Sequence, residues 1–178
     1  MEQLLGSFEG YTRSNAQVDF HKAMIDATLP HIYGQDFSKY RERLMKERNI
    51  TDLQSEVLIC CPRRFGKTTS VSMFIAVTLY CCPDAWISCF STGQRASTTL
   101  LDQAARFLMT LPGMKDRLLK KNQEQLFVRG SENKQLRFLV TSRELSSDLA
   151  GFSGVVVESL VEEGSVHSGI QTQTSPQT

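Results

Sequence analysis

The sequence predicts an α/β fold in which helices flank a parallel sheet, with a helical segment before the sheet and a short antiparallel hairpin added to it. Apolar runs at residues 57–61, 85–91 and 154–157 are typical of buried strands. Helical patterns at residues 67–79 and 94–111 follow the first two runs. Because strands alternate with helices, parallel pairing with right-handed crossovers is the expected arrangement.

The chain divides into three predicted parts. Residues 1–55 are expected to form a mostly helical prefix, since apolar residues recur at steps of three and four, as in Phe20, Met24 and Ala27. Residues 56–163 form the predicted core. Residues 164–178 are polar and low in complexity, which predicts a disordered tail because such a segment cannot bury a core.

The hairpin is predicted from the second half of the core. Two β-rich runs, at residues 125–129 and 135–141, are separated by Gly130, Ser131, Glu132, Asn133 and Lys134. Strand formers on both sides of a short segment rich in turn residues are typical of a β-hairpin. We therefore expect an antiparallel addition to the parallel core.

Composition limits the possible functions. The formal net charge is +1, so a general affinity for polyanions is not expected and any contact with nucleic acid would be local. The five cysteines lie in or beside apolar segments and lack metal-ligand spacing, which favours reduced core residues of an intracellular protein. The N-terminus lacks a secretory pattern, and the longest apolar stretch, residues 71–82, is too short to span a bilayer. The sequence thus predicts a protein that is neither secreted nor embedded in a membrane.

A candidate phosphate-binding loop lies in the segment Glu56–Thr69, which has the sequence EVLICCPRRFGKTT. An apolar strand, a short loop and then Gly66-Lys67-Thr68 at the start of a helix are the order that such a loop requires. The backbone amides at a helix N-terminus converge on one point and carry the positive end of the helix dipole. Lys67 would contact the β- and γ-phosphates of ATP, and the Thr68 hydroxyl would bind Mg²⁺.

The loop departs from the usual pattern G-x-x-x-x-G-K-[ST]. Cys61 stands where that pattern has its first glycine. Arg63 and Arg64 instead add two cationic donors beside the expected phosphates. The alternative is a chance Gly-Lys-Thr tripeptide after a buried strand. The predicted ATP-binding set comprises Arg63, Arg64, Phe65, Gly66, Lys67, Thr68 and Thr69.

The segment CPRRFGKTTSVSMF resembles the divergent phosphate loop of viral terminase large subunits, and the similarity continues through WISCFSTGQRAS and KKNQEQLFVR. These proteins are ATPases that pump double-stranded DNA into capsids, and the similarity to the herpesvirus and large-DNA-virus branch covers roughly residues 17–157. The resemblance implies an ATPase in which Arg63 neutralises charge in the transition state and Lys67 is catalytic. It also implies double-stranded DNA, a portal, a small terminase subunit and a homo-oligomeric ring as partners, in the nucleus or cytoplasm of an infected host cell.

The acidic residues of the expected metal site fit the family pattern less well. A strand is expected at residues 154–157, and Glu158 follows it where a paired Asp-Glu would stand. Either Glu158 is the catalytic and Mg²⁺-binding acid and the second acid is missing, or the strand continues and Glu162 and Glu163 form the catalytic pair. A third alternative is that these carboxylates belong to a solvated tail. The histidines show no partner in the sequence and receive no catalytic role.

The resemblance also leads to an expectation about completeness. Terminase large subunits continue into a nuclease domain, and the family pattern in this chain is lost near Glu158. This suggests a truncated or alternatively spliced form of a larger protein. The alternative function, which the incomplete acid pair favours, is a non-catalytic nucleotide-binding or regulatory fragment of the motor.

Overall fold

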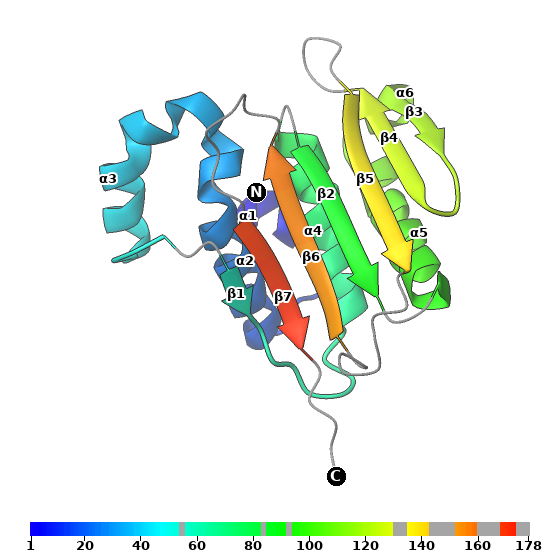
Figure 1. Ribbon diagram of the computed structural model, residues 1–178, viewed down its shortest axis with the longest axis horizontal. Helices are drawn as coiled ribbons and strands as arrows, with labels where there is room; N and C mark the ends of the chain where they lie inside the picture. Colours follow the sequence, from blue (N-terminus) through cyan, green and yellow to red (C-terminus); the bar gives the residue numbers. More distant parts are fainter. Residues whose placement is uncertain are drawn as a thin grey trace.

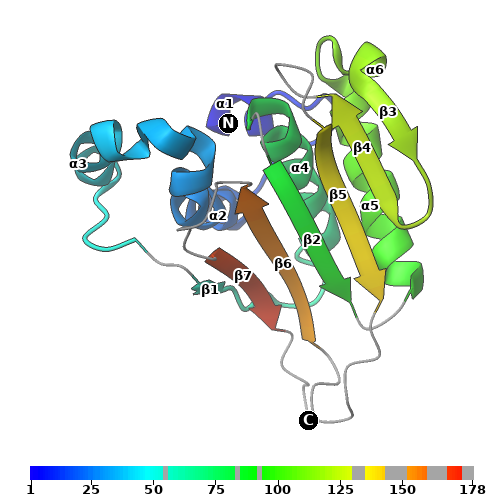
Figure 2. The ribbon, with the colours of Figure 1, turned by 45° about the horizontal axis from the view of Figure 1, so that its top comes forward.

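A computed structural model of the chain describes residues 1–53, 56–82, 85–91, 94–129, 135–142, 152–159 and 168–173. The described residues form a sheet with helices on one side, and helices α2, α4 and α5 lie against that side in both ribbon views (Figures 1 and 2). The helical elements are α1 (Glu2–Gly6), α2 (Asn15–Tyr33), η1 (Gly34–Asp36), α3 (Phe37–Arg48), α4 (Lys67–Cys81), α5 (Gln94–Thr110) and α6 (Met114–Arg117).

The described strands form one seven-stranded sheet in the order β1-β7-β6-β2-β5-β4-β3. The pairs β1·β7 and β2·β5 are parallel, and the other neighbouring pairs are antiparallel. Strands β4 and β5 occupy the two runs for which a hairpin is expected. The strands are β1 (Glu56–Leu58), β2 (Ala85–Ser91), β3 (Leu118–Lys121), β4 (Gln125–Arg129), β5 (Gln135–Ser142), β6 (Phe152–Ser159) and β7 (Ser168–Gln173).

This sheet is mixed and differs from the parallel sheet with one added hairpin that the sequence predicts. The difference lies in β6, the strand expected at residues 154–157, which runs antiparallel to both β2 and β7. An apolar run predicts a buried strand but contains no information on the strand's direction. The phosphate-loop class of the fold remains a prediction from the loop and its helix.

Strand β7 lies inside residues 164–178, the segment predicted to be a disordered tail. It pairs with β1 on one side and with β6 on the other. Ladder hydrogen bonds can hold a polar strand between two neighbours even though its side chains bury little apolar surface. The expected boundary between core and tail is therefore not reproduced at these six residues.

The core is centred on α4, which lies between α2 and α5 on one side of the sheet. Its central residues are completely buried on all sides, which is the pattern of a helix with no solvent-facing stripe. One polar group in it has no partner within the described residues, namely the buried hydroxyl of Thr78. The completely buried side chains of α4 include Phe74, Ile75, Ala76, Val77 and Leu79.

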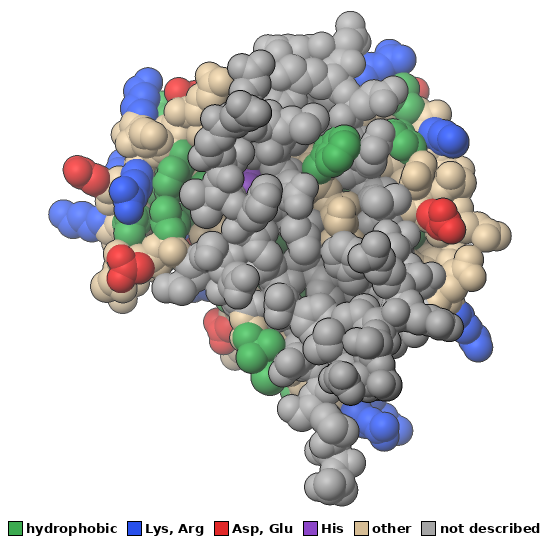
Figure 3. Space-filling model, in the orientation of Figure 1, with side chains coloured by type: hydrophobic (Ala, Val, Ile, Leu, Met, Phe, Trp, Pro, Cys, Tyr) green, Lys and Arg blue, Asp and Glu red, His purple; other side chains and the backbone are tan. Residues whose placement is uncertain are grey.

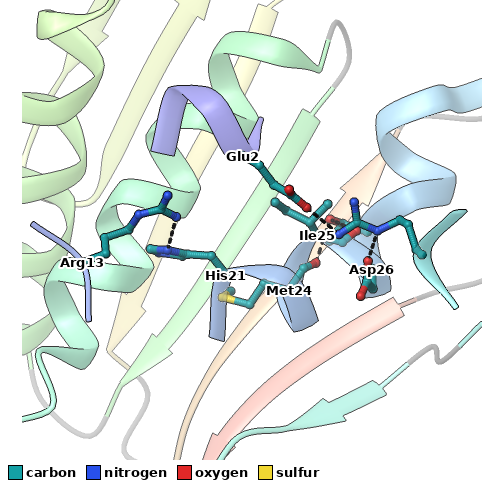
Figure 4. Close-up of polar contacts among 8 residues, drawn as sticks. Glu2, Arg13, His21, Met24, Ile25 and Asp26 are labelled. Carbon is teal, nitrogen blue, oxygen red and sulfur yellow. Dashed lines mark hydrogen bonds and ion pairs between the residues drawn. The ribbon is translucent and has the colours of Figure 1, made fainter. Parts of the chain in front are cut away.

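Helices α1 and α2 pack against α4, α3 packs against α2, and an ion-pair cluster joins the three N-terminal helices (Figures 2 and 4). Arg48, the last residue of α3, donates to Asp26 of α2 and to Glu2 of α1, the latter over 2.8 Å from Nη2 to Oε1. One guanidinium thus connects three helices. The rest of α3 carries exposed side chains of both charges, seen at the left of Figure 3.

Candidate phosphate-binding site

The loop between β1 and α4 contains two residues with left-handed backbone conformations. Residues 62–65 form a turn in which the Phe65 amide donates to the Pro62 carbonyl over 3.4 Å. Arg64 has a φ of 65°, which is uncommon for a residue with a Cβ, and Gly66 has a φ of 85°. Strained residues of this kind cluster at functional sites, so the loop is a candidate on geometry as well as on sequence.

Helix α4 begins directly after Gly66, and its first amides face no protein acceptor that the structure describes. Gly66 is the N-cap and provides no side chain to accept a hydrogen bond, while its carbonyl accepts from Ser70 over 2.9 Å. No carbonyl outside the helix accepts from the amides of residues 67–69 within the described part of the chain. Such amides, at the positive end of the helix dipole, can bind a phosphate group.

Three cationic residues lie on the loop and at the start of α4. Arg63 and Arg64 are exposed on the loop, and Lys67 is half-buried at the first position of α4. Burial raises the pKa of the Cys61 thiol, and the positive charge of Lys67 opposes that rise. Together the amides and cations form a donor set that suits a polyphosphate.

Gln17 is a site residue that the sequence analysis did not identify. Its Nε2 donates to the carbonyl of Phe65 over 2.9 Å. A Cβ built on Gly66 would lie only 2.9 Å from the same Nε2 atom, so the side chain passes directly against the glycine. The only sequence feature that could have drawn attention to Gln17 is its place in the capping box that begins with Ser14.

Two further residues of α2 contact the loop and the first turn of α4. The ring of Phe20 lies against the ring of Phe65, with centroids 5.8 Å apart. His21 is 1% exposed and its Nε2 is 2.9 Å from the carbonyl of Ser70. Residues Gln17, Phe20 and His21 share one face of α2 because they are spaced three and four positions apart.

The tautomer of His21 follows from its two partners, of which Figure 4 shows Arg13. The guanidinium of Arg13 lies 3.2 Å from Nδ1, and since a guanidinium only donates, Nδ1 must accept. The proton of the neutral ring is therefore on Nε2, which donates to the carbonyl of Ser70. Burial lowers the pKa of His21, the charge of Arg13 lowers it further, and the hydrogen bond to Ser70 acts in the opposite direction.

The structure does not bring the predicted acid Glu158 to this site. Glu158 is near the carboxyl end of β6 and pairs with Trp86, near the amino end of β2. Strand β1 points in the same direction as β2, so the loop after β1 leaves the opposite edge of the sheet. Thr68 and Glu158 therefore do not form one Mg²⁺ site. The other predicted acids, Glu162 and Glu163, lie outside the described residues.

The described residues fit a phosphate group but do not complete a metal site. Thr68 is exposed at the second position of α4 and offers one hydroxyl oxygen. Across the described ranges, no cluster of three or more His, Cys, Asp or Glu side chains could hold a metal ion. A hard cation such as Mg²⁺ requires several oxygen ligands.

Comparison with family models, with curated proteins and with solved structures finds no match to this chain. A search of the described helices finds none that combines the length and the apolar content needed to cross a membrane.

Proposed function

We propose that the chain is a nucleotide-binding domain of the phosphate-loop class, which binds the phosphates of ATP at residues 63–69. One observation supports this proposal above the others. The amides at the start of α4 have no acceptor outside the helix in the described residues, and they follow a left-handed Gly66. Lys67 and the exposed Arg63 and Arg64 add positive charge at the same point.

The resemblance of this loop to that of viral terminase large subunits extends the proposal to a motor. In that role the domain would hydrolyse ATP during packaging of double-stranded DNA, within a homo-oligomeric ring that engages a portal and a small terminase subunit. Lys67 would hold the β- and γ-phosphates, and Arg63 would neutralise charge that develops in the transition state. An arginine in this role contributes about 10³ to 10⁵ in rate.

A second candidate is a domain that binds nucleotide without hydrolysing it. The position of Glu158 favours this candidate, because the register of β6 places it at the edge of the sheet opposite the loop. A site without an acid to order Mg²⁺ and the attacking water retains phosphate binding but loses the catalytic positioning. Such a domain would act as a regulatory part of the motor.

Lys67→Ala tests the binding site itself. We expect loss of ATP binding, measured by isothermal titration calorimetry, with an unchanged circular dichroism spectrum, since Lys67 is half-buried at the helix start and outside the buried core. Lys46→Ala, on the exposed face of α3, is the matched control and should bind ATP as the wild type does. Wild-type affinity in the Lys67→Ala variant would show that this loop does not bind the phosphates.

Phosphate release measured with added double-stranded DNA separates the two candidates. Turnover that disappears in both the Lys67→Ala and Arg63→Ala variants supports the ATPase. ATP binding without turnover supports the non-catalytic domain and removes the motor proposal for this chain.

A further inference from the structure

We propose that Gln17 is a positioning residue of the phosphate loop, through which the N-terminal end of α2 sets the backbone geometry at Gly66. This inference rests on the proposed function, since it assigns a role at the same site. Gln17 touches the backbone of the loop and is not placed against a ligand. Its role would be to orient the amide that begins the phosphate-binding run.

Both ends of the Gln17 side chain are engaged, so its orientation is fixed. Oε1 accepts from the backbone amide of Ser14 over 3.0 Å, and Nε2 donates to the carbonyl of Phe65 over 2.9 Å. A backbone amide can only donate and a carbonyl can only accept, so flipping the side-chain amide would break both hydrogen bonds. The capping box at the start of α2 therefore aims the donor of Gln17 at the loop.

The contact with Phe65 acts on a peptide unit that matters for phosphate binding. The carbonyl of Phe65 and the amide of Gly66 belong to one planar unit, and in a trans peptide these two groups point in opposite directions. Holding the carbonyl toward α2 therefore turns the Gly66 amide away from α2. That amide directly precedes the acceptor-free amides of the first turn of α4.

The surroundings leave little room for another arrangement. The Phe65 ring lies against Phe20, so the residue is held through its side chain as well as its carbonyl. A Cβ at Gly66 would approach Nε2 of Gln17 to 2.9 Å, so any larger residue there would displace the Gln17 side chain. Of the ordinary side chains of this length, glutamine alone combines a neutral acceptor with a donor.

The experiment compares Gln17→Met with Ser14→Ala. Methionine keeps the length of the side chain and its neutral charge but removes the donor to Phe65. Ser14→Ala removes the hydroxyl that accepts a hydrogen bond from the backbone amide of Gln17. It leaves the backbone amide of Ser14, which donates to Oε1 of Gln17. Calorimetry should show ATP bound about five- to tenfold more weakly by Gln17→Met, the usual range for one lost hydrogen bond, and within about twofold of wild type by Ser14→Ala.

A third variant, Gln17→Glu, adds a second measurement, the pH dependence of ATP affinity. This dependence would not change if Gln17 only stabilised the fold. Its ionised carboxylate still accepts from Ser14 but repels the Phe65 carbonyl, whereas its protonated form can donate. The affinity gap between this variant and wild type should narrow as the pH is lowered from about 7.5 to about 5, toward the carboxyl pKa. Gln17→Met should show no such narrowing.

The outcomes separate the positioning role from the proposed function. Suppose that Lys67→Ala abolishes ATP binding but Gln17→Met binds ATP as tightly as the wild type. This result overturns the positioning role and leaves the proposed function intact. If the wild type binds no ATP, the function fails, and hydrogen exchange of residues 65–69 still decides the structural claim. Faster exchange there in Gln17→Met than in Ser14→Ala supports it, and equal exchange refutes it.

Discussion

Replacing Gly66 with alanine tests the packing at the start of α4 most directly. Two costs are expected. A Cβ at a φ of 85° costs about 1 kcal/mol through backbone strain. The same Cβ would lie 2.9 Å from Nε2 of Gln17, so the side chain must move and its hydrogen bond to Phe65 is lost, for about another 1 kcal/mol. We expect Gly66→Ala to lower the free energy of unfolding by about 2 kcal/mol, a fall in Tm of roughly 4–8 °C for a chain of this size.

Gly113 provides the matched control. It is also the N-cap of a helix, α6, and has a φ of 72°, but a Cβ there would meet no atom within 4 Å. Gly113→Ala should therefore show only the conformational cost of about 1 kcal/mol. Urea unfolding followed by circular dichroism measures both variants. If Gly66→Ala costs no more than Gly113→Ala, Gln17 does not lie against Gly66 and the description of this contact is wrong.

Three further predictions concern other contacts of the described residues. Arg48→Met should lower the free energy of unfolding by about 1 kcal/mol because two ion pairs are lost, whereas Arg43→Met, in an exposed pair on α3, should leave it unchanged in the same urea titration. Thr78→Val should raise Tm by about 2–4 °C, since it removes a buried hydroxyl without a described partner, and a lower Tm would reveal a hydrogen bond to that hydroxyl. The pKa of His21 is lowered in the folded chain, so its ring stays neutral there. Below pH 6.5 the same histidine is protonated in the unfolded chain, and the free energy of unfolding therefore falls as the pH decreases. The Tm of His21→Gln should fall less steeply than that of wild type over the same pH range.

The loop and its helix could be predicted because their determinants are local. Gly66, Lys67 and the apolar run that follows specify a helix start, and α4 begins at Lys67. The direction of β6 could not be predicted, because its valines satisfy a buried strand equally well in either orientation. The expected metal site depended on that direction, so Glu158 was placed beside Thr68 by analogy and the structure separates them.

The contacts that hold the loop could not be predicted for a different reason. Gln17 and Phe65 are 48 positions apart, and His21 and Ser70 are 49 positions apart. A capping box is a sufficient reason for a glutamine at position 17, so nothing in the sequence indicated that its side chain also contacts the loop. His21 likewise has no acidic residue three or four positions away in the sequence, and its partners are a carbonyl and an arginine brought near by folding.

The face of α2 that bears Gln17, Phe20 and His21 has an evolutionary consequence. Each residue added to or removed from a helix rotates everything beyond it by about 100°. Deleting Asn15 or Ala16 would leave Gln17, Phe20 and His21 in the chain, yet it would shift Ser14 out of its capping position relative to these three residues. Substitutions along the outer face of this helix should be tolerated, while the number of residues between its first turn and the buried histidine should stay constant.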